Sequence, residues 1–146
     1  MFNRYIDMME RQQKEFNEFP MFFAFDRAQF QDGLKRLGLE DAKDVHSIGC
    51  GGYVAQDKAI DYYAMLLRHR QELRQAIADD KDGTGFAYEM FRYELANHEY
   101  RITYCEDDAI EACGLTYEEV EKSPALKNAL KTAKDDVLAL AYVNIC

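Results

Sequence analysis

The chain has 146 residues, of which 48% are hydrophobic and 31% charged. This length suits one core that buries roughly two-thirds of the unfolded surface, so we expect a single domain over residues 1–146. The longest apolar runs, residues 21–25 and 137–143, fall far short of the roughly 20 residues that span a bilayer, and the amino terminus lacks the pattern of a signal peptide. We therefore expect no membrane contact and a cytoplasmic location.

Negative charge is concentrated in one region. The whole chain has a net charge of −9, whereas residues 79–121 hold 13 acidic side chains against three basic ones, a balance of −10. The remaining residues are thus close to neutral. Such asymmetry predicts a surface that meets a positively charged partner.

The first third of the chain predicts two helices and a strand. Helical periodicity covers residues 3–17, and the apolar run at 21–25 then favours a short buried strand. Asp26 suits the N-cap of a second helix, with Gln29 in place to complete a capping box. Gly33 inside that helix costs about 1 kcal/mol relative to alanine, which indicates either close packing or a tolerated weakness.

A glycine-rich turn is predicted to join two short strands, residues 45–48 and 53–55. The sequence Gly49-Cys50-Gly51-Gly52 also resembles a phosphate-binding loop, but such a loop leads directly into a helix, and here four residues intervene. We therefore favour a hairpin whose glycines take positive φ. Asp57 then suits the N-cap of a long third helix over residues 58–78.

The acidic region is predicted to contain a helix over residues 86–96, which stops at Asn97 in the left-handed conformation. The alternating residues 99–104 favour a strand, because Ile102 and Thr103 are β-branched. A short helix follows at about 106–113.

The carboxyl-terminal segment has two recognisable helix starts. Thr116 and Glu119 form a capping-box pattern, and Ser123-Pro124 suits the first turn of a last helix. The complete pattern predicts an α+β fold, with five or six helices packed on a small, mainly antiparallel sheet of three or four strands.

Catalytic and metal-binding patterns are weak. Ser47 and Ser123 are the only serines, and the second has a capping role, so a serine nucleophile is disfavoured. Glu94 and His98 are four residues apart and could offer two metal ligands, but no further ligands stand at metal spacing. We expect no catalytic residue, no metal and no cofactor, and a protein that is more suited to binding than to catalysis.

Residues 106–121 have the outline of a DNA-reading helix-turn-helix. They hold seven acidic residues and no basic one, so they would repel a phosphate backbone, and we expect no direct contact with nucleic acid. The plain interpretation is a helical corner with a capped turn. The other is a partner-binding surface of phosphate-like charge density, with Glu106, Asp107, Asp108, Glu111, Glu118, Glu119 and Glu121.

A second candidate site surrounds the polar and aromatic segment 93–100. Its side chains could form a ligand site, with Tyr93, Glu94, His98 and Tyr100, and with His46 nearby. The same groups could instead form an internal hydrogen-bond cluster that fixes the helix. A ligand site requires a concave, solvent-open pocket with convergent polar groups.

Several segments carry a resemblance to a known family. They are Glu10-Arg11-Gln12-Gln13-Lys14-Glu15-Phe16, Phe23-Ala24-Phe25 with Gln29-Phe30, Ser47-Ile48-Gly49-Cys50-Gly51-Gly52-Tyr53, Tyr93-Glu94-Leu95-Ala96-Asn97-His98-Glu99-Tyr100 and Gly114-Leu115-Thr116. The chain resembles an uncharacterised family of small acidic proteins from phages and conjugative elements of gut Firmicutes. The resemblance implies a mobile-element setting, in which small acidic proteins often block host nucleases by imitating DNA.

The charge and the resemblance together predict a non-enzymatic binding protein. Its acidic surface would dock on a basic protein surface, such as a nuclease of a host defence system of the CRISPR or restriction kind. The alternative is a small enzyme or ligand-binding domain centred on the 93–100 segment.

The third predicted helix, residues 58–78, also has a pattern that indicates assembly with a second copy of the chain. It is apolar or aromatic around most of its circumference, which means burial on several sides or contact with a second copy. The basic cluster Arg68, Arg70 and Arg74 could meet the acidic region of another copy, so we expect a homodimer.

Overall fold

The computed structural model describes residues 3–143. Within these residues it has five helices of seven or more residues and a three-stranded antiparallel sheet, which confirms the α+β prediction. The chain divides into two compact units. We call Gln12–Gln71 the sheet unit, and Met1–Arg11 with Glu72–Cys146 the helical unit. The helices α1 (Arg4–Glu18) and α3 (Ala59–Asp79) contribute residues to both, and the single domain stays a prediction.

The sheet unit is built on three short strands. They are β1 (Met21–Phe23), β2 (Val45–Gly49) and β3 (Gly52–Ala55), in the order β1-β3-β2. The two short 3-10 turns of this unit are η1 (Ala42–Asp44) and η2 (Gln56–Lys58). Val54 on the central strand is fully buried against α3, because its neighbours Ala59, Tyr62 and Met65 close over it.

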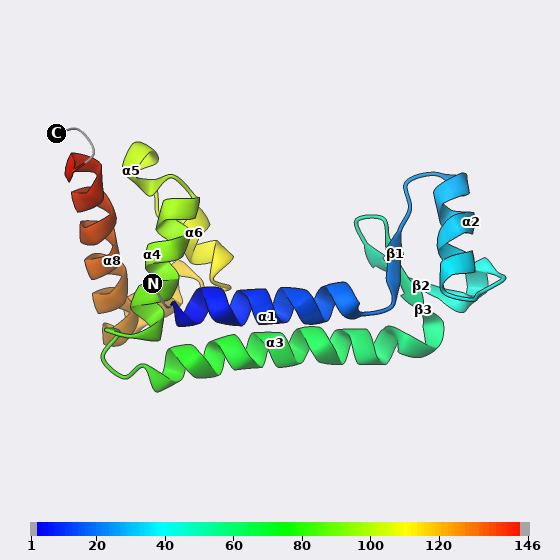
Figure 1. The fold of residues 1–146 in the computed structure, drawn as a ribbon. Helices are drawn as coiled ribbons and strands as arrows, with labels where there is room; N and C mark the ends of the chain where they lie inside the picture. The colour runs from blue at the N-terminus through cyan, green and yellow to red at the C-terminus, as the bar shows by residue number, and fades with distance from the viewer. Residues whose placement is uncertain (1–2, 144–146) are drawn as a thin grey trace. The chain divides into compact units, whose positions relative to one another are not determined.

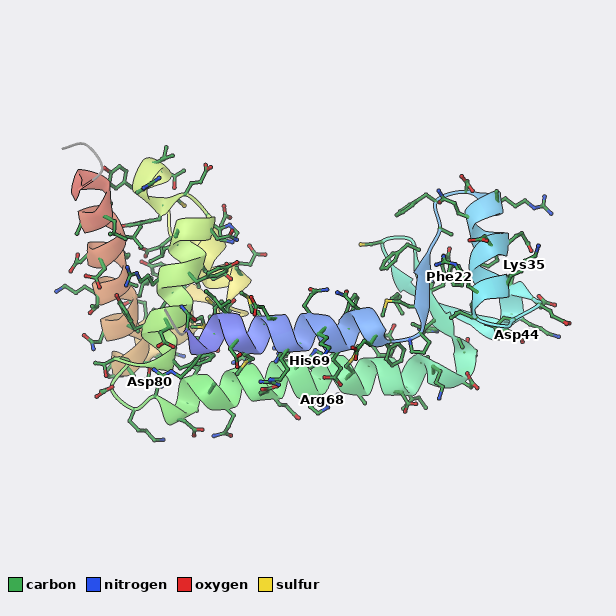
Figure 2. The ribbon with its side chains drawn as sticks, viewed as in Figure 1. Phe22, Lys35, Asp44, Arg68, His69 and Asp80 are labelled. Atoms are coloured by element: carbon green, nitrogen blue, oxygen red, sulfur yellow. The ribbon has the colours of Figure 1, made fainter. Side chains whose placement is uncertain are left out.

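The helix α2 (Arg27–Arg36) packs on β1 through its glycine. A Cβ atom on Gly33 would lie 2.1 Å from the ring of Phe22, so only glycine admits the ring there. Figure 2 shows Phe22 between β1 and α2. Of the two interpretations of Gly33, close packing is therefore confirmed.

The turn between β2 and β3 is the predicted hairpin. Gly49, Cys50 and Gly51 all have positive φ, at 87°, 52° and 79°. Such backbone angles are typical of tight hairpin turns, whose twist matches that of the flanking strands. The glycine-rich run thus serves β-sheet pairing.

The helical unit is centred on α4 (Phe86–Asn97) and α8 (Pro124–Val143), which lie side by side (Figure 1). Met90, Phe91 and Leu95 of α4 are fully buried, and fully buried Ala129 and Ala133 on α8 leave room for them. The smaller helices of this unit are α5 (Tyr100–Thr103), α6 (Asp107–Ala112) and α7 (Tyr117–Lys122).

The predicted strand at residues 99–104 is wrong. This segment forms the single helical turn α5, and its flanking residues Glu99 and Tyr104 both have φ of 56°. A strand needs a neighbour to bond with, and all three strands found in residues 3–143 belong to the sheet unit. The β-branched pair therefore could not outweigh the missing partner.

Some of the predicted helix ends are correct and others are wrong. The Asp26 carboxylate accepts a hydrogen bond from the backbone N–H of Gln29 at 2.7 Å. Thr116 and Glu119 form a complete capping box. Asp57 is not the cap of α3, because it lies within η2, and the left-handed residue after α4 is Glu99, not Asn97. Gln29 turns its side chain to the amide of Phe25 and so leaves the predicted box at Asp26 incomplete.

The start of α4 has a cap that lies outside the helix. The Asp80 carboxylate accepts hydrogen bonds from the amides of Gly85 and Ala87, at 3.1 and 2.9 Å. Figure 2 shows Asp80 between the end of α3 and the start of α4. A carboxylate at this position also interacts favourably with the helix dipole.

Candidate functional site

The acidic surface of the helical unit lies on α6 and α7. Ala109, Ile110 and Val120 turn into the core, which leaves the acidic residues between them on the outside. This is the expected consequence of amphipathic helices whose polar positions are almost all acidic. The seven residues predicted for partner binding therefore belong to one corner of the fold.

Four of the seven acidic residues already have a cationic neighbour. Their ion pairs are Glu106–Lys134 at 2.6 Å, Glu118–Lys122 at 2.6 Å, Glu119–Arg74 at 2.8 Å and Glu121–Lys127 at 3.8 Å. All four cations stand outside residues 79–121, so the charge count over that window overstated the exposed negative charge. Asp107, Asp108 and Glu111 are exposed and have no ion pair within residues 3–143.

Glu119 has a structural role besides its charge. The hydrogen bond from Arg74 is the main cause that lowers the pKa of Glu119, and the carboxylate also bonds the Thr116 amide in the capping box. On α8, the hydrogen bond to Glu106 raises the pKa of Lys134. Both pairs therefore hold the helical corner together, and a substitution there would change the fold as well as the charge.

The residues of the second candidate site are distributed between the interior and the surface. Glu94 is only 4% exposed and accepts a hydrogen bond from the Tyr5 hydroxyl at 2.7 Å, while His98 Nε2 lies 3.2 Å from its other oxygen. Burial, followed by the bond to Glu94, raises the pKa of Tyr5. These three groups form an internal cluster of the kind that the sequence offered as the alternative to a ligand site.

The other three members of that site make separate contacts, and one of them, Tyr93, packs against the ring of Tyr5 in the cluster. Tyr100 is buried, and the Lys134 ammonium lies 5.8 Å from its ring centre. Tyr93 is half-buried with its ring centre 5.8 Å from that of Tyr5. His46 belongs to the sheet unit, where its Nε2 lies 3.1 Å from the Tyr63 hydroxyl.

A groove of about 780 Å³ opens beside this cluster in the helical unit. It runs along one stripe of α4 and is bounded by α5, α8 and the start of α1. Of the predicted site residues only Tyr93 lines it. Its lining comprises Asn3, Ile6, Thr84, Tyr88, Glu89, Arg92, Tyr93, Ala96, Glu99, Arg101, Ile102, Val137 and Leu140.

Two arginines, Arg92 and Arg101, line the groove. In the sequence they stand out only as rare basic residues in an acidic region. Arg92 donates to the Tyr88 hydroxyl at 3.2 Å, and Tyr88 in turn donates to Asp136. Tyr88, Arg92 and Ala96 share one face of α4, because they are four residues apart. This spacing was the available signal, but nothing local indicated that α5 and α8 would complete the groove.

Neither a metal centre nor a membrane span is found in the described part of the chain. Among residues 3–143, no group of three or more His, Cys, Asp and Glu side chains is placed to hold a metal ion. No helix in this part of the chain is long and apolar enough to cross a membrane.

The chain was compared with known protein families, curated proteins and solved structures. The model of DUF7659, a family of unknown function, matches residues 4–136. The chain belongs to this family. Neither a curated protein nor a solved structure matches it.

The DUF7659 match includes both candidate surfaces. It covers every acidic residue of α6 and α7 and all groove-lining residues except Asn3, Val137 and Leu140. The predicted membership of an uncharacterised family is thus confirmed, while the setting in phages and conjugative elements of gut Firmicutes stays a prediction. A family of unknown function assigns no role to any residue, so function is argued from the geometry.

Proposed function

We propose that this protein is a non-enzymatic binding protein whose acidic surface docks on a basic surface of another protein. The observation that carries the proposal is the set Asp107, Asp108 and Glu111, three exposed carboxylates on α6 with no ion pair in the described chain. Their neighbours on α7 already have cations from the same chain. The three carboxylates can therefore pair with cations from a partner.

The shape of this surface suits long basic side chains. A hollow of about 200 Å³ is lined by Asp107, Glu111 and Tyr117 with the apolar residues Ile110 and Leu115. Lysine and arginine bury their aliphatic stems on apolar surface while the charged head stays at the rim. A basic partner would thus gain both apolar contact and charge pairing at one place.

The partner that we propose is a nucleic-acid-handling enzyme, in the specific case a nuclease of a host defence system. An enzyme of this class has a basic channel for a phosphate backbone, and a row of carboxylates presents a similar charge pattern. The regional charge and the resemblance to mobile-element proteins support this choice. The proposal places the protein in the cytoplasm and requires no direct contact with nucleic acid.

The test is affinity capture from a bacterial host lysate followed by a competition experiment. We expect the wild type to capture a nucleic-acid-binding enzyme. Excess plasmid DNA should release the captured enzyme, because DNA competes with the acidic protein for the basic channel of the enzyme. The combined variant Asp107→Lys, Asp108→Lys, Glu111→Lys should lose the captured enzyme at physiological salt, with an unchanged thermal melt.

A matched control makes this test specific. The variant Glu10→Lys, Glu18→Lys, Glu40→Lys changes the net charge equally at three exposed positions on α1 and after α2, and it should still capture the enzyme. Capture that survives the α6 reversal, or that DNA does not displace, would contradict the proposal.

We further propose that the protein forms a homodimer through α3. Ile60, Tyr63 and Leu67 are 83%, 48% and 56% exposed and follow i, i+3, i+7 spacing, so they form one apolar stripe. Of the predicted basic cluster, Arg74 pairs with Glu119 and Arg68 with Glu15, which leaves Arg70 at the end of this stripe. The stripe, rather than the acidic region, is thus the proposed contact.

A further inference from the structure

The groove of the helical unit has the size and lining of a small-molecule site. Its volume of about 780 Å³ lies within the range of about 300–1,000 Å³ that is typical of ligand pockets. Ile6, Ile102, Val137 and Leu140 supply apolar walls, and the rings of Tyr88 and Tyr93 add flat surface. Ile102 and Leu140 are 68% and 47% exposed, so apolar area remains open to a ligand.

The charges of the lining favour an anion with a single charge. Glu89 is already neutralised by Arg4, which lies 3.0 Å from it and bonds both of its oxygens. Arg92, Arg101 and Glu99 then remain, and none of them has an ion pair within residues 3–143. Two cations against one carboxylate leave a surplus of one positive charge, although the protein as a whole is strongly acidic.

Arg92 is held in place without being neutralised by direct pairing. Its contact is the Tyr88 hydroxyl at 3.2 Å, and Asp136 accepts the proton of that hydroxyl from behind. One nitrogen of the guanidinium is thereby anchored, and the others can face the groove. A planar guanidinium offers paired N–H donors that match a carboxylate.

The second arginine comes from a turn of unusual backbone geometry. Arg101 and Ile102 lie in α5, between Glu99 and Tyr104, which both have the left-handed φ of 56°. Non-glycine residues adopt this conformation at a cost of about 1 kcal/mol or more, and such residues cluster at binding sites. The turn brings a charged and an apolar side chain to the same edge of the groove.

We propose that this groove binds a small amphipathic monocarboxylate. Its carboxylate pairs with Arg92 and Arg101, and its aliphatic body lies on Ile6, Ile102 and Leu140. This activity is separate from the proposed docking of α6, because the groove contains none of the α6 or α7 residues. Glu99 at the rim disfavours a second negative charge and so selects a monoanion over a phosphate-like dianion.

The test is isothermal titration calorimetry of the full chain with decanoate, below the critical micelle concentration of decanoate. We expect one saturable site per chain, with weaker binding of the neutral 1-decanol and of the cationic decylamine. Arg92→Gln and Arg101→Gln should each weaken decanoate binding about tenfold, the effect of losing one charge-assisted contact. Glu99→Gln should strengthen it, because a like charge is removed.

Two controls keep the outcome specific. Arg27→Gln removes the same charge from an exposed position on α2 and should leave the affinity unchanged. Arg92→Gln also loses the Tyr88 contact, whereas Arg101 is exposed with no ion pair in the described chain, so Arg101→Gln tests the charge without that complication. Absence of saturable decanoate binding would overturn the proposal, as would tighter binding of decylamine or an equal loss in Arg27→Gln.

Discussion

Glu15 shows how one residue can connect two helices through charge. Its carboxylate, on α1, contacts both Arg68 and His69 of α3, with His69 Nε2 2.9 Å away. Figure 2 shows Arg68 and His69 on α3. The hydrogen bond from Arg68, followed by that from His69, lowers the pKa of Glu15 from 4.5 to about 2. Both helix segments belong to the sheet unit.

This depressed pKa predicts an acid-dependent loss of stability. Because the folded pKa lies below the unfolded one, the contribution of Glu15 is complete above pH 4.5 and is lost as the pH falls to about 2. We expect Glu15→Gln to have a lower free energy of unfolding than the wild type at pH 7. Near pH 2 the two free energies of unfolding should be almost equal. Urea titrations across this range measure the difference, with Glu10→Gln as an exposed control on the same helix. A constant difference at all pH values would contradict the assignment.

At the scale of elements, the contact between α2 and β1 depends on the absence of one side chain. Helix propensity alone predicts that Gly33→Ala stabilises the protein by about 1 kcal/mol. The ring of Phe22 predicts the opposite sign, because it would lie 2.1 Å from the added methyl group. We expect a loss of about 1–3 kcal/mol, the usual range for overpacking.

Urea unfolding of a double-mutant cycle decides between these signs. Phe22→Leu removes the clashing ring, so Gly33→Ala should cost less in that background than in the wild type. The exposed substitution Ala28→Gly on the same helix reports the propensity effect by itself. A stabilised Gly33→Ala protein would contradict this prediction, because the Phe22 ring would then have to move aside at little cost.

At the scale of the whole molecule, the α3 stripe predicts an antiparallel dimer with paired charges at its ends. If Ile60 of one copy meets Leu67 of the other, then Asp57 lies opposite Arg70 twice, by two-fold symmetry. Asp57 and Arg70 are both exposed. Light scattering at tens of micromolar protein should show a dimer at low salt, weakened at roughly 0.5 M salt because ions screen these pairs.

Charge reversal tests this arrangement directly. Asp57→Arg and Arg70→Asp should each shift the protein towards the monomer, because like charges then face each other. The double variant should restore the dimer, since the pairs form again with exchanged signs. A wild-type monomer at both salt concentrations, or a double variant no better than the single ones, would refute the dimer.

Local physics was enough to predict most elements of this fold. Helix starts at Asp26 and Thr116, and the glycine hairpin, depend on side-chain to backbone hydrogen bonds or φ preferences over a few residues. The strand at 99–104 failed because a strand needs a distant partner, whereas a helical turn bonds within itself. Where a property is set by near neighbours along the chain, the amino-acid order by itself determined it.

The candidate sites depended on contacts between residues far apart in the chain. The buried bond from Tyr5 to Glu94 spans 89 positions, and the cations that neutralise four acidic residues come from α3 and α8 as well as from the next turn. The groove needs side chains from four helices at once. The amino-acid sequence by itself determined that the protein is acidic and where along the chain the acidic residues lie. Only tertiary packing decided which carboxylates stay unpaired and which arginines face a groove. Both properties depend on neighbours that are close in space, and several of those neighbours are distant in the chain.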